Sequence, residues 1–163
     1  MATNKTSPSP AIPFRKVPVA VVLLLTVISG GLYLPIWLLT RRAAFNQLHS
    51  EERLHKGTLV AALLAFGLAL LLSLYAAYLT MPLAGATEPG QPLAATLLDL
   101  LANLLALLAL VPLVYQTFRA KRMLADHFNH NEHLQRDIPF SNLWTLLLLN
   151  VYLQYKINQL THS

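Results

Sequence analysis

The chain has 163 residues, of which 55% are hydrophobic and only 12% charged, with a formal net charge of +5 and no cysteine. Soluble domains carry roughly 25% charged residues, so the composition argues against a soluble domain, and the missing cysteine excludes disulfides and cysteine-based sites. The basic residues flank apolar segments and build no basic face, which argues against nucleic-acid binding and favours a multi-pass membrane protein.

The predicted organisation is one membrane domain between two polar ends. Residues 1–16 are rich in serine and proline and are expected to be disordered, and 161–163 form a short tail. The helical membrane domain over 17–160 contains four apolar segments, at 17–39, 58–80, 93–118 and 138–155. At ~1.5 Å per residue the second and third are long enough to cross a ~30 Å hydrocarbon core. The expected fold class is therefore all-α.

The first apolar segment is interrupted by SGGLYLPIW at 29–37. Ser29, Gly30 and Gly31 favour a tight turn, because glycine tolerates the backbone angles that such a turn needs. The chain would then enter the bilayer as a short helix and return to the same side. The alternative is a complete span that is only kinked, with Pro35 contributing to the kink.

Small residues recur at every fourth position along the second segment. Small side chains let helix backbones approach closely in lipid, so this row predicts a packing face against the third segment or against a second copy of the chain. Its members are Ala61, Ala65, Ala69, Ser73 and Ala77.

The third segment carries an acid inside its apolar stretch. Asp99 and Asn103 lie four residues apart and Thr96 precedes Asp99 by three, so the three side chains share one helix face. An acid at membrane depth points to an ion or proton path; alternatively, it forms a hydrogen bond that holds helices or protomers together. Pro112 is expected to kink this segment near its far end.

The sequence DHFNHNEH follows the third segment and contains three histidines. Imidazoles close together on a helix can share a metal ion, which makes His127, His130 and His133 candidate ligands. His127 and His133 lie six residues apart, roughly 120° around a helix, and so do not face one way. A solvated connection is favoured, and no metal or cofactor is predicted.

The fourth segment is shorter and more polar, which makes it marginal as a span. Its stretch NVYLQYK repeats GLYLPIW of the first segment: with Tyr33 placed on Tyr152, Thr26 falls on Thr145. Both copies are followed by Asn-Gln-Leu. A true repeat would insert both segments alike, as two broken or re-entrant segments beside two full spans. Chance identity between leucine-rich segments, with four full spans, is the alternative.

Charge predicts which connections share a side of the membrane. Lys and Arg cluster in 40–57 and 119–137 and are absent from 81–92. By the positive-inside rule the two basic connections are cytoplasmic and 81–92 lies outside.

The stretches GLYLPIWLLTRRAAFNQL and LLLNVYLQYKINQL resemble a family of small bacterial multi-pass membrane proteins that is catalogued only as a domain of unknown function. The shared pattern is G-(I/L)-Y, an aromatic residue a few positions on, and a polar helix that ends near Asn-x-Leu. This chain departs from it by Pro35 and by Ile36, where a second aromatic is frequent. The resemblance implies the bacterial cytoplasmic (inner) membrane and no established chemistry. The positions that carry it are Tyr33, Trp37, Asn46, Tyr152, Tyr155, Lys156 and Asn158.

These features favour a non-catalytic integral membrane protein, an assembly or accessory subunit that acts through helix packing. Its expected partners are the lipid bilayer and either a second copy or another membrane protein, and not nucleic acid. The alternative is a homo-oligomeric channel or small transporter that uses the broken segments and Asp99. An intramembrane enzyme is disfavoured because paired acid and base groups are missing from the apolar segments.

Overall fold

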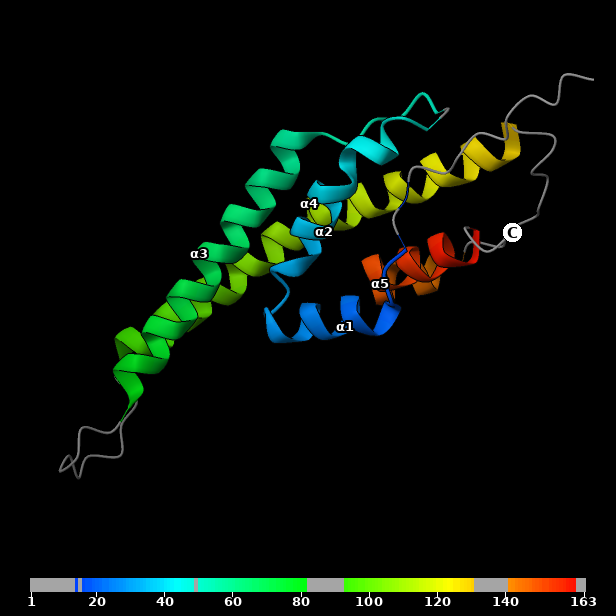
Figure 1. Cartoon of the computed structure of the whole chain (residues 1–163). Helices are drawn as coiled ribbons and strands as arrows, with labels where there is room; N and C mark the ends of the chain where they lie inside the picture. The colour runs from blue at the N-terminus through cyan, green and yellow to red at the C-terminus, as the bar shows by residue number, and fades with distance from the viewer. Residues whose placement is uncertain (1–13, 15, 49, 82–92, 131–140, 161–163) are drawn as a thin grey trace, which may run out of the picture.

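The computed structural model describes residues 14, 16–48, 50–81, 93–130 and 141–160, without the side chains of 128–130 and 160. These residues form helices and their connections, with no strand among them (Figure 1). The helices are α1 (Val19–Ile28), α2 (Tyr33–Phe45), α3 (Lys56–Thr80), α4 (Leu93–His130) and α5 (Asn142–Leu160). The all-α prediction is confirmed.

The long helices α3 and α4 run antiparallel along each other and form the longest dimension of the molecule (Figure 1). They contain the second and third apolar segments, and both are long and apolar enough to cross a membrane. Leucine side chains cover their outer faces, as in Leu64, Leu71, Leu100 and Leu107, each more than 60% exposed. This hairpin is the part of the fold that suits a bilayer.

Alanines spaced seven residues apart line the contact between α3 and α4. Each of them is at most 6% exposed: Ala62, Ala69 and Ala76 on α3, and Ala95, Ala102 and Ala109 on α4. Seven residues make two turns of a supercoiled helix, so all the members of each row face the partner helix. Their small side chains allow the two backbones to approach closely.

The packing face predicted from every fourth residue only partly coincides with this contact. Ala69 is buried, but Ala61 and Ala77 are exposed, and Ala65 and Ser73 are half-buried. Residues four apart advance by ~40° per step around a helix, so the row winds away from the partner, whereas a seven-residue spacing drifts by only ~20°. The row that packs inside the chain is therefore the seven-residue one.

The helix α4 extends well past the predicted end of the third segment. It continues to His130, so the predicted connection at 119–137 is helical over its first part. The residues after 118 are rich in alanine, lysine, arginine, methionine and leucine, which are strong helix formers. Pro112 lies inside α4 and does not end it.

The break predicted in the first apolar segment is present between α1 and α2. Gly30 and Gly31 both have positive φ, 57° and 90°. The amide of Gly31 donates to Thr26 O at 2.9 Å and that of Gly30 to Val27 O at 3.1 Å, the bonding pattern of a Schellman helix end. The hydroxyl of Ser29, which caps the end of α1, accepts the amide of Tyr33, the first residue of α2, at 2.9 Å. Pro35 falls in the first turn of α2, where a missing N–H is tolerated.

The helix α5 is broken at Leu149, which corresponds in the sequence repeat to the glycine turn of the first segment. The offset that places Tyr33 on Tyr152 places Gly30 on Leu149, which has φ 40° and ψ −114° inside α5. The preceding helices also match: Thr26 Oγ1 donates to Val22 O at 2.7 Å, and Thr145 Oγ1 donates to Ser141 O at 2.8 Å. The two segments therefore share a helix–break–helix form, and α1 contacts α5 (Figure 1).

The hydrophobic core lies where α2, α5, the segment 45–54 and the far part of α4 meet. Its fully buried members include Leu38, Leu54, Leu113, Met123, Leu153 and Ile157. Phe14 also joins it, with its ring 4.8 Å from that of Phe45 in an edge-to-face contact. The predicted disordered N-terminus therefore contains at least one packed residue; 1–13 and the tail 161–163 lie outside the described residues.

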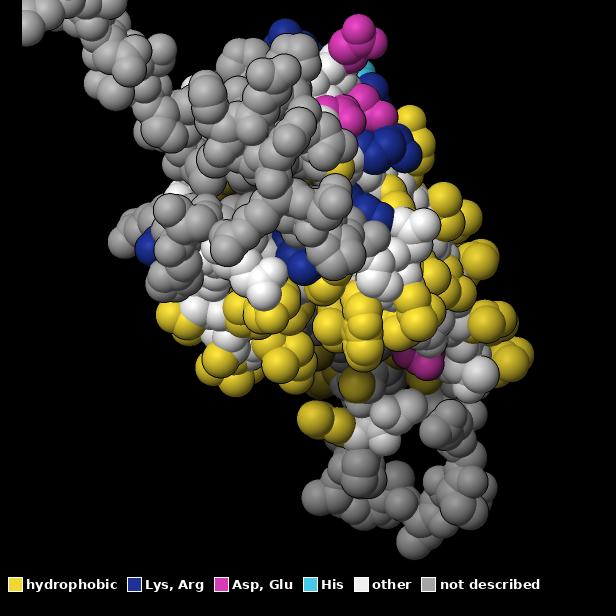
Figure 2. All heavy atoms as spheres, turned by 90° about the vertical axis from the view of Figure 1, so that its right-hand side faces the viewer, with side chains coloured by type: hydrophobic (Ala, Val, Ile, Leu, Met, Phe, Trp, Pro, Cys, Tyr) yellow, Lys and Arg dark blue, Asp and Glu magenta, His cyan; other side chains and the backbone are white. Residues whose placement is uncertain are grey.

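Polar and apolar side chains separate along the molecule. In the end-on view, Lys and Arg gather in the upper part, and hydrophobic side chains cover the surface below them (Figure 2). The Lys and Arg side chains of the described residues are thus segregated from the apolar surface.

Candidate functional site

The acid predicted inside the third segment forms hydrogen bonds within the chain. Ser73 Oγ on α3 donates to Asp99 Oδ1 on α4 at 3.2 Å. Asn103 Nδ2 donates to Asp99 O at 2.8 Å and to Asp99 Oδ2 at 3.3 Å. Asp99 is exposed at the hairpin surface and joins α3 to α4. A hydrogen bond between helices is the geometry expected for the alternative to an ion path.

A small cleft lies beside this carboxylate, between the two hairpin helices. It has a volume of about 250 Å³, and its lining residues are Ser73, Ala76, Ala77, Thr80, Ala95, Thr96 and Asp99. Thr96, predicted from spacing to share a face with Asp99, is one of them. The cleft offers three hydroxyls and one carboxylate, and Asp99 is the one titratable group among its described lining residues, so it suits hydrogen bonding and lacks the paired acid and base that proton transfer uses.

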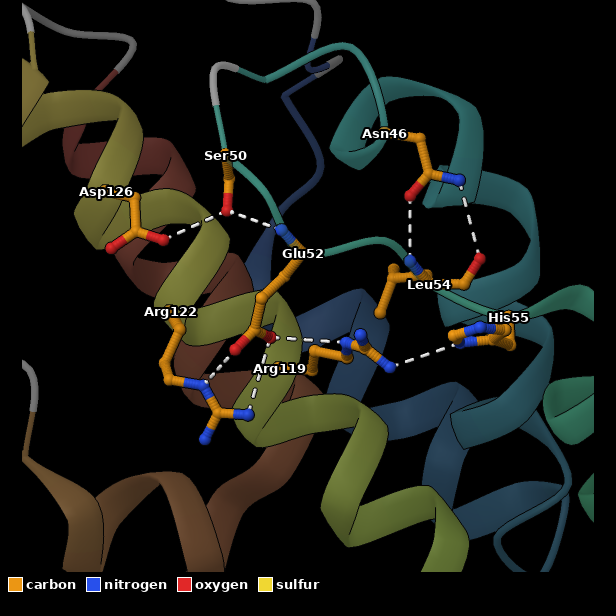
Figure 3. A network of polar contacts seen from close by, with 8 residues as sticks. All are labelled: Asn46, Ser50, Glu52, Leu54, His55, Arg119, Arg122 and Asp126. Atoms are coloured by element: carbon orange, nitrogen blue, oxygen red, sulfur yellow. Dashed lines mark hydrogen bonds and ion pairs between the residues drawn. The ribbon is translucent and has the colours of Figure 1, made fainter.

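At the basic end, the carboxylate of Glu52 binds two arginines of α4 (Figure 3). Its oxygens lie 2.6 Å from Arg122 Nε and 3.3 Å from Arg119 Nε. The hydrogen bond with Glu52 raises the pKa of Arg122. Arg119 also donates to His55 Nδ1 at 3.2 Å. Exposed ion pairs contribute little to stability individually. The carboxylate of Glu52 nevertheless joins the connection before α3 to the helix α4.

The connection before α3 also forms hydrogen bonds with Asp126 of α4 and with Asn46 at the end of α2 (Figure 3). Ser50 Oγ donates to Asp126 Oδ2 at 2.9 Å. Asn46 Oδ1 accepts the amide of Leu54 at 2.8 Å, and the carbonyl of Leu54 accepts Arg42 Nε at 2.8 Å. Leu54 is 1% exposed, so these bonds satisfy backbone groups that burial removes from water. We refer to Asn46, Ser50, Glu52, Arg119, Arg122 and Asp126 as the clamp.

The residues that carry the family resemblance hold the broken segments together. Asn158 Nδ2 donates to Val17 O at 2.8 Å, which joins the end of α5 to the start of the first segment. Tyr152 OH accepts the amide of Ser141 at 3.0 Å, across the break in α5. Trp37 is 1% exposed and lies under Arg41, whose guanidinium is 4.9 Å from its ring. Burial lowers the pKa of Arg41.

Of the remaining residues of that set, Tyr155 is exposed and Lys156 is buried, both on α5, and Asn46 caps the end of α2. Tyr155 OH accepts Gln159 Nε2 at 2.8 Å, and Lys156 Nζ donates to Gln159 Oε1 at 3.3 Å. Tyr33 begins α2 and is partly buried against the core.

Buried amide side chains between the broken segments were not predicted as a site. Asn150, which follows the break in α5, is 0% exposed, and its Nδ2 donates to Leu34 O of α2 at 2.7 Å. Gln154, one turn further, and Gln116 on α4 are at most 2% exposed. The side-chain oxygens of these three amides have no hydrogen-bond partner among the described residues. The only sequence signal was the polar content that made the fourth segment marginal as a span.

Of the three histidines considered as metal ligands, the structure describes the side chain of His127 alone. His127 is 4% exposed on α4, the side chain of His130 is not described, and His133 lies outside the described residues. The described residues contain no group of three or more potential metal ligands.

Comparison of the chain with models of protein families, with curated proteins and with solved structures gave no match. The resemblance of the two broken segments to a bacterial membrane-protein family remains a prediction.

Proposed function

We propose that the chain is a non-catalytic integral membrane protein, an assembly or accessory subunit that acts through its helix faces. The observation that carries the proposal is the hydrogen bonding of Asp99 to Ser73 and Asn103. An acid engaged in this way joins helices, and the faces around it are leucine-rich and available to lipid or to another membrane protein.

We further propose that the chain resides in a bacterial cytoplasmic membrane as two spans, α3 and α4. The helix α1 has 10 residues, or ~15 Å, about half of a hydrocarbon core. With its break at Gly30, the first segment enters and leaves from one side, and the fourth follows it. The connections 40–57 and 119–137 are cytoplasmic in this arrangement, and 81–92 lies outside.

The test is to measure the mass of the Asp99→Asn variant in lipid nanodiscs, together with its flux in proteoliposomes. Asparagine keeps an oxygen that can accept from Ser73 and removes the charge. If the chain forms homo-oligomers through the face that bears Asp99, the variant changes oligomer mass or melting temperature, with no proton or cation flux in either protein. Flux in the wild type that disappears in the variant while mass stays constant would contradict an accessory role.

One observation favours the alternative, a homo-oligomeric channel or transporter. Asn150 and Gln154 place unpartnered amide oxygens beside two broken helices, and broken helices line ion and substrate sites in transporters. The discriminating variant is Gln154→Leu, which removes a buried polar group without altering charge. Loss of a measured flux in this variant would favour transport, and higher stability without any flux would favour the accessory role.

A further inference from the structure

The cleft beside Asp99 contains a negative charge that the apolar part of the chain cannot neutralise. Both side chains that donate to its carboxylate, Ser73 and Asn103, are uncharged. The ion pairs found among the described residues all involve Glu52, at the other end of the hairpin. The sequence contains no Lys, Arg or His from 57 to 118, so neither the apolar length of the two helices nor the connection between them supplies a counter-ion.

Asp99 belongs to the part of the hairpin that suits a bilayer. It stands six residues after Leu93, the start of α4, which is ~9 Å along the helix axis. Leu97 and Leu100 on either side of it are each more than half exposed. An ionised side chain at membrane depth costs free energy, and such residues usually pair with one another. The two hydrogen bonds solvate the carboxylate without cancelling its charge, and a carboxylate can accept about four bonds.

The shape of the cleft favours the side chain of a neighbouring helix over a larger ligand. Its volume of about 250 Å³ is below the roughly 300–1,000 Å³ of pockets for drug-sized ligands. Three of its lining residues are Ala76, Ala77 and Ala95, and small side chains let another helix approach closely. Ser73 and Ala77 are the last two members of the four-residue row, and the contact with α4 leaves both at least partly exposed.

A second copy of the chain does not carry the complementary charge. The four apolar segments, 17–39, 58–80, 93–118 and 138–155, contain no Lys, Arg or His. A copy packed on this face at the same depth would bring apolar side chains or another Asp99, and like charges repel. The charge of the cleft is therefore complemented by a different protein.

We propose that the cleft binds a Lys or Arg side chain on a membrane-spanning helix of another protein, with Asp99 as its counter-ion. The basic group would donate to the carboxylate, and the hydroxyls of Thr80 and Thr96, which also line the cleft, would accept its remaining N–H groups. A spanning helix is favoured over a soluble amine because exposed leucines flank Asp99. The inference rests on the accessory role put forward under the proposed function and specifies the chemistry of the partner.

The probes are synthetic spanning peptides, rich in leucine and alanine, that differ at one position. The first has Lys in the outer third, at the depth of Asp99, the second has Leu there, and the third has Lys in the inner third. Binding to the full chain in phosphatidylcholine nanodiscs is followed by energy transfer to a dye on Ser163→Cys, since the chain has no other cysteine. We expect the first peptide to bind roughly tenfold more tightly than the second, the usual size of one charge-assisted hydrogen bond. The third should bind no better than the second.

Variants of the chain separate the charge from the fold. Asp99→Asn keeps an oxygen for Ser73 and should bind the Lys and Leu peptides equally. Asp99→Lys should reverse the preference, toward a peptide with Asp in the outer third, which a folding defect cannot produce. The matched control is Ser73→Ala, which removes a neutral donor, keeps the carboxylate and should keep the preference for Lys.

Four results would overturn the proposal. The first is equal binding of the Lys and Leu peptides to the wild type, and the second is a Lys preference that persists in Asp99→Asn. The third is an equal gain from Lys in the inner third, because the effect of charge would then be general. The fourth is displacement of the Lys peptide by butylamine, which would mean that the cleft takes a free amine. Flux is measured on the same protein in proteoliposomes, so the absence of both flux and peptide preference rejects this partner chemistry alone and leaves the accessory role.

Discussion

Gly31 has the most demanding backbone of the described glycines, with φ +90° in the break between α1 and α2. A Cβ at this position would come within 3.8 Å of Phe66 Cε1, which is an ordinary van der Waals contact. The requirement for glycine is therefore conformational and not a matter of space. The same holds at Gly30, where the nearest atom would be Leu70 Cδ1 at 3.9 Å.

Gly31→Ala should destabilise the protein by roughly 1–2 kcal/mol, the usual cost of a side chain in the left-handed region. The matched control is Gly67→Ala, in the interior of α3, where an added Cβ meets nothing within 4 Å. It should stabilise the helix by roughly 0.5–1 kcal/mol. Thermal unfolding in one detergent compares the two variants, and a shift of the same sign in both would show that the backbone angle at Gly31 is not the cause.

At the residue scale, the break after α1 is predicted from its own residues. The break in α5 can be located only by aligning the fourth apolar segment with the first. Ser29, Gly30 and Gly31 are typical of a turn, and the turn is present. Leu149 gives no such signal, because a leucine with positive φ is disfavoured. Its position becomes visible only when Tyr152 is aligned with Tyr33. The buried hydrogen bond from Asn150 to Leu34 could not be predicted from the sequence, since it depends on how the two broken segments pack together.

At the element scale, hydropathy predicts α3 and α4 but not the faces that they present to each other. In an alanine- and leucine-rich helix, rows of small residues occur at several spacings. The row that packs is selected by the alanines of the opposing helix, Ala95, Ala102 and Ala109. The contacts of the clamp could not be predicted from the sequence either, because Glu52 binds arginines that lie about 70 positions later in the chain.

Ala69→Leu should destabilise the hairpin by roughly 1–3 kcal/mol, because added volume at a close contact forces the helices apart. Ala69 is 6% exposed in the middle of the seven-residue row. The same substitution at the exposed Ala61 is the matched control and should leave the melting temperature nearly unchanged. If Ala61→Leu is the more damaging variant, the four-residue row packs against a second copy, and a fall in oligomer mass would reveal it.

At the scale of the whole molecule, the two breaks and the clamp bear on one question, which is how many times the chain crosses the membrane. Arg42, Arg119 and Arg122 are joined through the connection 46–55, so both basic segments belong to the same end. Asn158 is bonded to Val17, and this contact joins the ends of the two broken segments. An arrangement with two spans leaves both chain ends on the side of the clamp, whereas four full spans would put them on the opposite side.

Single cysteines distinguish these arrangements, and the native chain has no cysteine to react in the background. With two spans, a cysteine that replaces Ser7 should resist an impermeant thiol reagent in intact cells, and one that replaces Thr87 should react. A cysteine at Ser163 should also be protected, because the fourth segment is inserted like the first. Permeabilised cells provide the control, since all three positions should then react. Labelling of both Ser7 and Ser163 from outside would establish four spans, in which the breaks at Gly30 and Leu149 only bend membrane helices. Labelling of one end alone would mean that two segments of the same local form are inserted differently, and the repeat would then describe their folding and not their topology.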